Sequence, residues 1–499
     1  MNSDATSPPK GTVRDWVEHR AKVSGDCTAY LFFDGAERLT WRDLRDEAHS
    51  LAGHLTAQGI EKGTSVAILQ PNGREAVVAL YGAMYGGFRA TVINLVAGDE
   101  AIRYALDHCE ARFALIGVGQ TELFERVRPA GVEPFHVTKT TTEVSLHPLD
   151  AQDDALLMYT SGTTGRPKGV VHSHASLLAG GWTPSLAHDL TDADCGLCVL
   201  PIYHINGLCV TVISALITGG RLAVAEKFST SRFWAQCDEA EATWFSVVPT
   251  IISHLLHSDI TPSVHTRLRL RFGRSASSAL APDVQTAFET RFEVPIVETM
   301  GLTETAAQIL SNPLPPGLRK IGSPGLAYGN EVCILSPQLH PLPPHEQGEI
   351  AVRGPNTMRE YLKNPEATEA TFTSDGWLRT GDLGHIDDDG YFFVTGRLKE
   401  LIIKGGENIA PREIDEALYS HPDVIEAAAF ARPCNTYGER VEAAVKLRDG
   451  SKISPELLGR ICVERLGEFK SPDKVHVLDD LPKGPSGKIQ RLKLVDLTS

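Results

Sequence analysis

The sequence predicts an α/β fold with a large N-terminal domain, built from doubly wound sheets and a small β region, and a small α+β C-terminal domain. Three observations lead to this prediction. Short apolar strands alternate with helical stretches early in the chain, which is typical of parallel sheets covered by helices on both faces. A proline-rich and then strand-like segment follows at 340–355. After residue 396 the chain becomes polar and glycine-rich, and a compact α/β pattern then begins.

A helix is predicted to open at Thr40–Asp43, where threonine and aspartate stand three residues apart as in a capping box. Apolar residues then return at helical spacing, and Gly59 ends the pattern. These apolar positions are Leu44, Ala48, Leu51 and Leu55. The spacing is that of an amphipathic helix.

Strands and helices alternate after this point. Ser65–Leu69 is a short apolar run that predicts a strand, and Pro71–Gly73 supplies turn residues after it. Ala76–Tyr85 predicts the next helix, which runs into a pair of glycines, and Phe113–Ile116 predicts the next strand.

The small β region is predicted from two local patterns. The segment 340–355 is rich in proline and then strand-like. Asp387–Gly390 places an Asp-Gly pair at a tight turn before the strand-like run Tyr391–Val394, which is a hairpin signal. The acidic residues of this turn lack the ligand spacing of a calcium-binding loop.

A domain boundary is predicted near residue 397, which gives domains at 1–396 and 397–499. The 499 residues exceed what a single hydrophobic core usually supports. In the second domain we expect a helix at Pro411–Ser420, strands at Val424–Ala431 and Val441–Leu447, and a helix that begins at Ser454 as N-cap with proline at its first position.

The charge of the chain is unevenly distributed. The net charge is −15, yet residues 397–499 hold 17 basic and 17 acidic residues, so the first 396 residues carry the whole excess. A negative surface argues against nonspecific binding of nucleic acid. An anionic ligand must therefore be held by local donors.

Targeting and cysteine patterns favour a cytoplasmic protein that binds neither membrane nor nucleic acid. No apolar run is long enough to span a bilayer, and the first ten residues lack the character of a signal peptide. Nine scattered cysteines favour a reducing compartment, and the lone CxxC pair Cys195–Cys198 predicts buried or incidental thiols rather than a zinc site. The oligomeric state stays open.

The segment Leu157–Val170 is the strongest functional signal, because an apolar run ends in hydroxyl residues, glycines and Lys168. Glycine lets backbone amides approach oxyanions closely, hydroxyls donate further hydrogen bonds, and the lysine adds positive charge. The Walker A pattern does not fit this segment. We predict a polyphosphate-binding loop formed by Thr160, Ser161, Gly162, Thr163, Thr164, Gly165 and Lys168.

Five further segments place polar residues at the ends of apolar stretches or in loops. They are Pro201–Gly207, Thr299–Glu304, Arg379–Asp382, Gly396–Glu400 and Pro485–Arg491. In this order, and together with the phosphate loop, they resemble the adenylate-forming superfamily of acyl-CoA synthetases, peptide-synthetase adenylation domains and luciferases. The resemblance covers nearly the whole chain and rests on the ordered set.

The resemblance implies an ATP-dependent acid–CoA ligase that works in two half-reactions. A carboxylate attacks the α-phosphate of ATP to give acyl-AMP and pyrophosphate, and the thiol of CoA then displaces AMP. The implied cofactors are ATP, Mg²⁺ and coenzyme A. Such transfers depend on positioning and charge neutralisation more than on covalent help from the protein.

The resemblance also implies roles for residues beyond the phosphate loop. Thr303 contacts the α-phosphate, and Glu304 binds Mg²⁺, a hard cation suited to oxygen ligands. Asp382 binds the ribose hydroxyls, Arg397 supports the ribose or phosphate side, and Lys488 bridges the attacking carboxylate and the α-phosphate. Each residue also has a plain alternative: a solvated carboxylate for Glu304 and Asp382, an ion pair for Arg397 and a mobile charge for Lys488.

The C-terminal domain is implied to swing between the half-reactions about Lys399. In one pose Lys488 enters the site. In the other, Gly405 and Gly406 line a channel for the pantetheine arm, where glycine permits close approach. The alternative for Lys399 is an ordinary interdomain salt bridge.

The acid-binding and adenine-binding residues are implied to lie in three segments. His204 is at the gate between acid pocket and thiol channel, and Arg271–Leu280, which includes Ser277, contributes to the acid pocket and the adenine site. Met300 stands where many members stack an aromatic residue on adenine. A core position is the alternative for His204 and for Met300.

Arg274 and Ser275 point to a small polar or doubly anionic acid, because a guanidinium can bind a second anion in bidentate fashion. The chain most resembles the oxalate–CoA ligase branch, although that branch has a histidine where Ala307 stands here. Oxalate-, malonate- and sulfoacetate-like acids stay open, as does a structural ion pair for Arg274.

Two other functions stay open. One is an adenylation enzyme that loads a carrier protein in trans, although the sequence ends soon after Gln490-Arg491 with no carrier domain, which favours free CoA. The other is a nucleotide-binding protein without catalysis, against which the set Lys168, Glu304, Asp382 and Lys488 argues.

Overall fold

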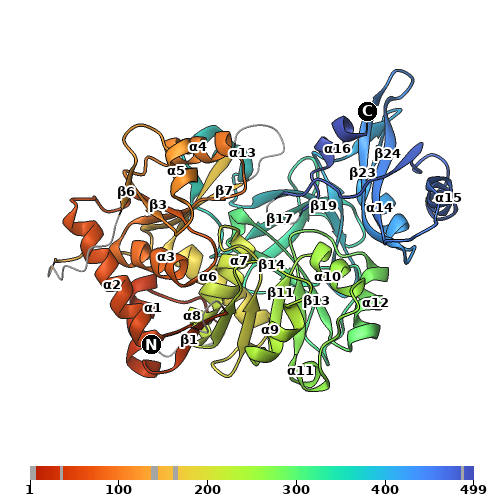
Figure 1. Ribbon diagram of the computed structural model, residues 1–499. Helices are drawn as coiled ribbons and strands as arrows, with labels where there is room; N and C mark the ends of the chain where they lie inside the picture. The colour runs from red at the N-terminus through yellow and green to blue at the C-terminus, as the bar shows by residue number, and fades with distance from the viewer. Residues whose placement is uncertain (1–6, 34–36, 136–143, 161–166, 485–487, 499) are drawn as a thin grey trace.

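A computed structural model of the chain describes residues 7–33, 37–135, 144–160, 167–484 and 488–498. Two large sheets lie beside each other with helices between and around them, and two smaller sheets follow along the chain (Figure 1). The segment from β21 onward, drawn in blue in Figure 1, forms a separate lobe at one end of the molecule. The predicted α/β class with a small C-terminal domain is confirmed.

The first large sheet has nine strands in the order β15-β14-β13-β12-β11-β9-β10-β1-β2. Its centre, from β13 to β1, is parallel, whereas β14, β15 and β2 pair antiparallel at the edges. The sheet is thus mixed rather than purely parallel. Its strands are β1 (Thr28–Phe32), β2 (Glu37–Thr40), β9 (Cys195–Cys198), β10 (Arg221–Val224), β11 (Trp244–Val247), β12 (Phe272–Ser275), β13 (Ile296–Leu302), β14 (Ala307–Ser311) and β15 (Leu326–Ala327).

The second large sheet has seven strands in the order β18-β8-β7-β4-β3-β5-β6. The strands from β7 to β6 are parallel neighbours, whereas β7, β8 and β18 form an antiparallel edge. Its strands are β3 (Ser65–Leu69), β4 (Arg89–Val92), β5 (Phe113–Ile116), β6 (Glu133–Phe135), β7 (Asp154–Thr160), β8 (Lys168–Ser173) and β18 (Glu360–Tyr361).

Most helices cover these two sheets, and α6 (His174–Ala187) lies between them. This helix is buried at nearly every position, because it packs against β7 and β8 on one side and β14 on the other. The others are α1 (Val13–Ser24), α2 (Trp41–Ala57), α3 (Arg74–Gly86), α4 (Asp99–His108), α5 (Thr121–Val127), α7 (Ile205–Gly207), the π-helical turn η2 (Leu208–Ile213), α8 (Ser214–Thr218), α9 (Phe233–Glu239), α10 (Pro249–Leu256), α11 (Val264–Arg269), α12 (Pro282–Phe292) and the 3₁₀ turn η3 (Thr303–Thr305).

The local predictions in this region are confirmed. In the capping box of α2, Thr40 Oγ1 accepts from Asp43 N at 3.1 Å and Asp43 Oδ2 accepts from Thr40 N at 3.1 Å. The turn after β3 has an additional role, because its buried Asn72 donates to the carbonyls of Leu200 and Ala225 and so ties the two large sheets together.

The small β region is a four-stranded antiparallel sheet in the order β16-β17-β19-β20. Its strands are β16 (Glu331–Leu335), β17 (Gly348–Arg353), β19 (Leu378–Ile386) and β20 (Phe392–Arg397), and α13 (Pro365–Thr371) precedes β19. The predicted hairpin joins β19 to β20, and Gly390 adopts φ of 82° at its turn, a conformation that favours glycine.

The last sheet orders β22-β21-β24-β23, with β25 beside β24. Its strands are β21 (Ile402–Lys404), β22 (Glu407–Ile409), β23 (Val424–Cys434), β24 (Gly438–Leu447) and β25 (Lys474–Val477), and its helices are α14 (Pro411–Tyr419), α15 (Pro455–Leu466) and α16 (Arg491–Leu497). The predicted N-cap is confirmed, since the Ser454 side chain accepts from Leu457 N and Pro455 is the first helical residue.

This last sheet packs on the nine-stranded layer through α10 and β23. Ser253 Oγ donates to Ile425 O at 2.5 Å, and His254 Nε2 lies 3.1 Å from Glu426 Oε1. These contacts fix where the following segment, including Lys488, lies relative to the larger sheets. In the described part of the chain, every helix is too short or too polar to cross a membrane.

Candidate active site

A cavity of about 190 Å³ lies where the C-terminal lobe meets β13, β19 and β20. It brings together five of the predicted residues from distant parts of the sequence. They are Ser277, Met300, Asp382, Arg397 and Lys488.

Asp382 and Arg397 face each other on the hairpin of β19 and β20. Arg397 Nε donates to Asp382 Oδ1 at 2.5 Å and Nη2 donates to Oδ2 at 3.4 Å. The Asp382 carboxylate raises the pKa of Arg397, and this effect outweighs burial, which lowers it. The predicted ion pair of Arg397 is therefore formed with the predicted ribose ligand, and it fixes the orientation of that carboxylate.

Lys488 reaches the cavity from the segment before α16. Its Nζ lies 3.3 Å from Glu400 Oε1, and Arg491 Nε lies 3.5 Å from Glu400 Oε2. Burial and the nearby Arg397 lower the pKa of Lys488, while Glu400 and Asp382 oppose them. Glu400 and Arg491 stand inside two of the segments singled out from the sequence, but only the fold shows that they share contacts with Lys488.

The turn η3 holds Thr303 and Glu304 at the end of β13. His172 Nε2 donates to Thr303 O at 2.7 Å, and burial lowers the pKa of His172 to about 4, so the ring is neutral near pH 7. Tyr361 donates its hydroxyl to Glu304 Oε1 at 2.7 Å. Burial and then Glu304 raise the pKa of Tyr361, so its hydroxyl keeps its proton. His172 and Tyr361 had no signal in the sequence.

The environment of Glu304 fits Mg²⁺. One carboxylate oxygen of Glu304 accepts a hydrogen bond from the Tyr361 hydroxyl, and the second oxygen can bind a cation. Among the described residues no group of three or more His, Cys, Asp or Glu side chains is placed to hold a metal. A cation would be bound by Glu304 together with substrate phosphates, which is the usual manner of Mg²⁺ binding.

Thr160 and Lys168 pair with each other at the end of the β7–β8 hairpin where the predicted phosphate loop connects the two strands. Thr160 Oγ1 donates to Lys168 O at 3.5 Å. Lys168 Nζ lies 4.3 Å from the centre of the Tyr361 ring. The other predicted loop residues, Ser161, Gly162, Thr163, Thr164 and Gly165, lie outside the described residues.

Arg274 is almost completely buried on β12, with 1% of its surface exposed. Its hydrogen bonds reach Gln308 Oε1 at 3.3 Å, Asn206 Oδ1 at 2.7 Å and Ser246 Oγ at 3.3 Å, all of them uncharged. Burial lowers the pKa of Arg274 to about 9. The alternative of a structural ion pair is therefore wrong among the described residues.

Arg274, Ser275 and His204 do not line the cavity itself. Asn206 connects Arg274 to it, because its amide nitrogen donates to Ser277 Oγ at 3.2 Å and Ser277 lines the wall. The Ser275 hydroxyl is buried without a hydrogen-bond partner among the described residues. His204 directly precedes α7, and its ring centre lies 5.0 Å from that of Tyr203.

Gly405 and Gly406 form the turn between β21 and β22, outside the cavity. Their φ angles of 61° and 89° favour glycine. Lys399 is exposed in the turn that follows β20. In this arrangement Lys488 is at the cavity and the glycine turn is away from it.

Glu298 is a further residue of the cavity wall that sequence reasoning missed. Its Oε1 accepts from Leu280 N at 3.1 Å, its Oε2 is buried without a hydrogen bond among the described residues, and burial raises its pKa. It directly precedes the segment Thr299–Glu304, but a single carboxylate in an apolar strand carried no functional pattern.

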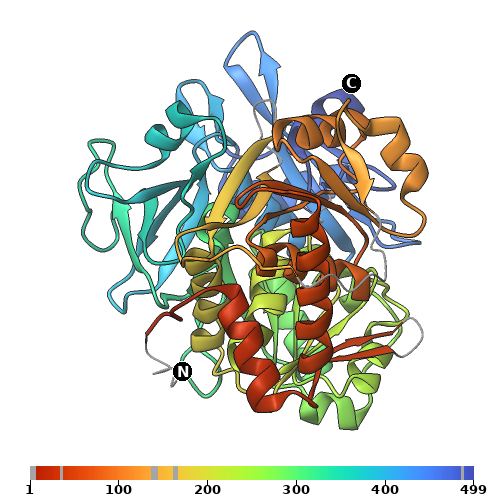
Figure 2. The same ribbon diagram turned by 90° about the vertical axis from the view of Figure 1, so that its left-hand side faces the viewer.

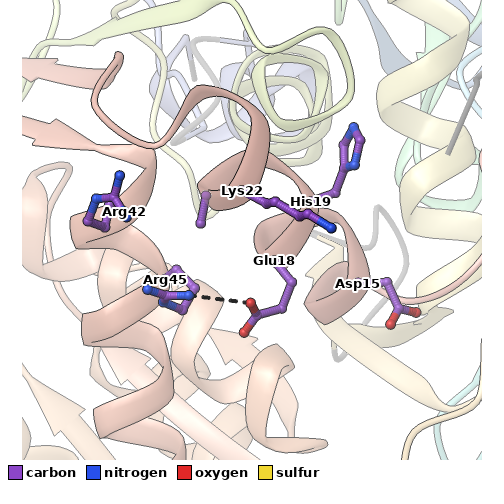
Figure 3. A pocket seen from close by; sticks show the side chains of 7 residues that line it. Asp15, Glu18, His19, Lys22, Arg42 and Arg45 are labelled. Carbon is purple, nitrogen blue, oxygen red and sulfur yellow. Dashed lines mark ion pairs between the residues drawn. The ribbon is translucent and has the colours of Figure 1, made fainter.

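A second hollow of about 610 Å³ lies on the surface between α1 and α2 (Figure 3). These two red helices face the viewer in Figure 2. The charged side chains that line the hollow partly neutralise one another, as in the contact of 3.5 Å between Arg45 and Glu18. None of the predicted site residues lines it.

Comparisons with known proteins find relatives along nearly the whole chain. The AMP-binding enzyme family matches residues 17–362, and the AMP-binding enzyme C-terminal domain matches residues 413–488. Sulfoacetate–CoA ligase of Cupriavidus necator is 44% identical over 99% of this chain and 100% of its own length. Oxalate–CoA ligase of Arabidopsis thaliana is 35% identical over 96% of this chain and 97% of its own. The o-succinylbenzoate–CoA synthetase of Bacillus subtilis, solved with ATP and a magnesium ion, is 30% identical, with a TM-score of 0.85 over 96% of this chain and 98% of that one.

Proposed function

This chain belongs to the AMP-binding enzyme family and is an AMP-forming acid–CoA ligase, and we propose that its acid is a small carboxylate with a second anionic group. Relatives that act on sulfoacetate and oxalate support this proposal, since both acids carry two negative charges. ATP, Mg²⁺ and CoA are the other reactants and cofactors.

The observation that carries the proposal is the buried Arg274 guanidinium, whose hydrogen-bond acceptors are all neutral. Burying an uncompensated charge costs several kcal/mol, about the range measured when one partner of a buried ion pair is removed. An anion bound beside Arg274 offsets that cost. The unpartnered Ser275 hydroxyl, which follows Arg274 on β12, supplies one more donor for the same anion.

The remaining residues divide the first half-reaction among them. Lys168 and the loop before it neutralise the β- and γ-phosphates, and Thr303 donates to the α-phosphate. Asp382, oriented by Arg397, accepts from the ribose hydroxyls. Lys488 holds the attacking carboxylate against the α-phosphate. The new bond joins a carboxylate oxygen to the α-phosphorus as the bond to the bridging oxygen breaks, and pyrophosphate leaves.

The second half-reaction needs a different set of residues at the same acyl group. The CoA sulfur attacks the acyl carbon as its proton is lost to solvent, and AMP leaves with the former carboxylate oxygen. We propose that His204 lies at the gate between acid and thiol, that Lys399 is the pivot of the C-terminal domain, and that Gly405 and Gly406 line the thiol channel after rotation. Ser277 and Met300 bind the adenine side.

The test is release of AMP and pyrophosphate with Mg-ATP, CoA and a panel of oxalate, malonate, sulfoacetate, acetate, benzoate and octanoate. We expect turnover with the short doubly anionic acids. Turnover confined to acetate, benzoate or octanoate overturns the assignment of the acid. Absence of turnover with every acid would favour a carrier-protein acceptor or a protein without catalysis.

An Arg274→Gln variant tests the role of the guanidinium directly. Removing one partner of a buried charged contact costs roughly 2–5 kcal/mol, so kcat/KM for the dianionic acid should fall by about 30-fold or more. Acetate, which has no second anion, should lose little. The matched control is Ser246→Ala, which removes one acceptor of Arg274 but keeps its charge. Equal losses for dianionic and monoanionic acids in Arg274→Gln would contradict the role.

A further inference from the structure

Tyr361 contacts both of the charged residues that the proposed function assigns to the triphosphate and its metal ion. Its hydroxyl donates to Glu304 Oε1 at 2.7 Å. Its ring lies under Lys168, with 4.3 Å between Nζ and the ring centre. With 5% of its surface exposed, the side chain is held in one place while it makes both contacts.

The backbone around Tyr361 makes the same connection. Tyr361 pairs with Val170, two residues after Lys168, in the short ladder between β18 and β8. Leu362 N donates to Gly169 O at 2.7 Å. At the other end of this segment, Met358 N donates to Glu304 O at 2.7 Å. The segment 358–362 therefore joins the strand after the phosphate loop to the turn that carries Glu304.

We propose that Tyr361 is a positioning residue that fixes Glu304 and Lys168 relative to each other before the nucleotide and its metal ion bind. The inference rests on the proposed adenylation. The hydroxyl holds one carboxylate oxygen of Glu304 and so directs the other oxygen toward the cation. The ring steadies the lysine ammonium through a cation–π contact.

Fixing the side chains of Lys168 and Glu304 in advance lowers the free-energy cost of binding the nucleotide and its metal ion. A free lysine side chain loses about 2 kcal/mol of rotamer entropy when it is immobilised. A contact that restricts it beforehand removes part of this cost from nucleotide binding. Hydrogen bonds to the outer oxygen of a metal-binding carboxylate typically change metal affinity about 10–100-fold.

Tyr361→Phe removes the hydroxyl but keeps the ring beneath Lys168. We expect the Mg²⁺ concentration for half-maximal adenylation to rise about 10–100-fold, with kcat largely recovered at saturating Mg²⁺. Binding of Mn²⁺ in the presence of ATP, measured by electron paramagnetic resonance without any acid, should weaken by the same factor. Reaction of preformed acyl-adenylate with CoA uses neither metal nor pyrophosphate and should not change.

Tyr391→Phe is the matched control. Tyr391 likewise donates its hydroxyl, here to the carbonyl of Leu318, and likewise lies under a lysine, with Lys320 Nζ 4.6 Å from the ring centre. It does not contact Glu304 or Lys168, so its variant should keep the normal Mg²⁺ requirement. Adding Tyr361→Phe to Glu304→Gln should weaken Mn²⁺ binding no further, because the acceptor is already altered.

A Tyr361→Phe variant with normal Mn²⁺ affinity and normal Mg²⁺ dependence overturns the inference. So does an additive effect in the double variant. If the phenylalanine variant folds poorly, Tyr361→Met repeats the Mn²⁺ measurement, because methionine also lacks the hydroxyl and its smaller, flexible side chain fits a buried site. The Mn²⁺ measurement does not depend on the identity of the acid, so the inference can fail while the proposed acid stands, and the reverse.

Discussion

Replacement of Lys488 by alanine should separate the two half-reactions. In the structure the Lys488 ammonium reaches the cavity that contains Asp382, Arg397 and Met300. In its proposed role it stabilises negative charge only while the carboxylate attacks the α-phosphate. Loss of one such donor typically costs about 3 kcal/mol, so adenylation should slow about 10²–10³-fold.

The structure indicates that this loss is not a folding effect. Glu400, the partner of Lys488, keeps Arg491 at 3.5 Å when the lysine is removed. Partly exposed ion pairs contribute roughly 0–1 kcal/mol, so the melting temperature should change by only a few degrees. The matched control is Lys493→Ala, which removes an exposed lysine of α16.

Adenylation is measured as acid-dependent exchange between pyrophosphate and ATP, and thiolation as a single turnover of preformed acyl-adenylate with CoA. We expect the first to fall and the second to stay within a few fold of the wild type, while Lys493→Ala changes neither. Equal loss in both assays would refute the assigned role. An unchanged exchange rate would refute the placement of Lys488 at the reacting carboxylate.

Three further predictions follow from local environments. Because burial and Arg397 lower the pKa of Lys488, adenylation should decline at a pH below the ordinary lysine value of 10.5, and a pH–rate profile that declines only above it would contradict this. Burial lowers the pKa of His172 and of His174 from 6.5 to about 4, so the unfolded state binds protons first and stability is lost as pH falls through this window. The loss should be about 2 kcal/mol per histidine at pH 5, and equal melting temperatures at pH 7 and pH 5 would exclude it. Gly301→Ala should destabilise the protein by about 3 kcal/mol or more, because its Cβ would lie 1.6 Å from Ala307 O. Gly459→Ala, in open space on α15, should instead be neutral or slightly stabilising in the same denaturant titration.

Elements with local signals were predictable from the sequence. The capping box at Thr40, the Asp-Gly turn before β20 and the N-cap at Ser454 depend on neighbouring residues, and all three are confirmed. The order of the nine strands was not predictable, because β1 pairs with β10, almost 200 residues later. The antiparallel edges of both large sheets depend on the same kind of distant pairing.

The residues of the candidate site likewise fall into those with a local sequence signal and those that depend on distant contacts. Asp382, Arg397 and Lys488 stood in recognisable segments, and the structure brings them to one cavity. Tyr361 and His172 were missed because their importance lies in contacts with Glu304 and Thr303, which are more than 50 residues away. The neutral surroundings of Arg274 likewise come from three separate elements, so the sequence left an ion pair open.

The pairing of Asp382 with Arg397 has a consequence for the reactive intermediate. Both residues belong to one hairpin of the four-stranded sheet, and the exposed turn with Lys399 follows only after β20 ends. If rotation occurs at that turn, as proposed, the hairpin stays with the large sheets while the lobe with Lys488 departs. The proposed contacts of Asp382 with the ribose are then kept while the lobe rotates. Acyl-adenylate would remain tethered through its ribose while the thiol approaches, which limits its escape and hydrolysis in the interval between the two reactions.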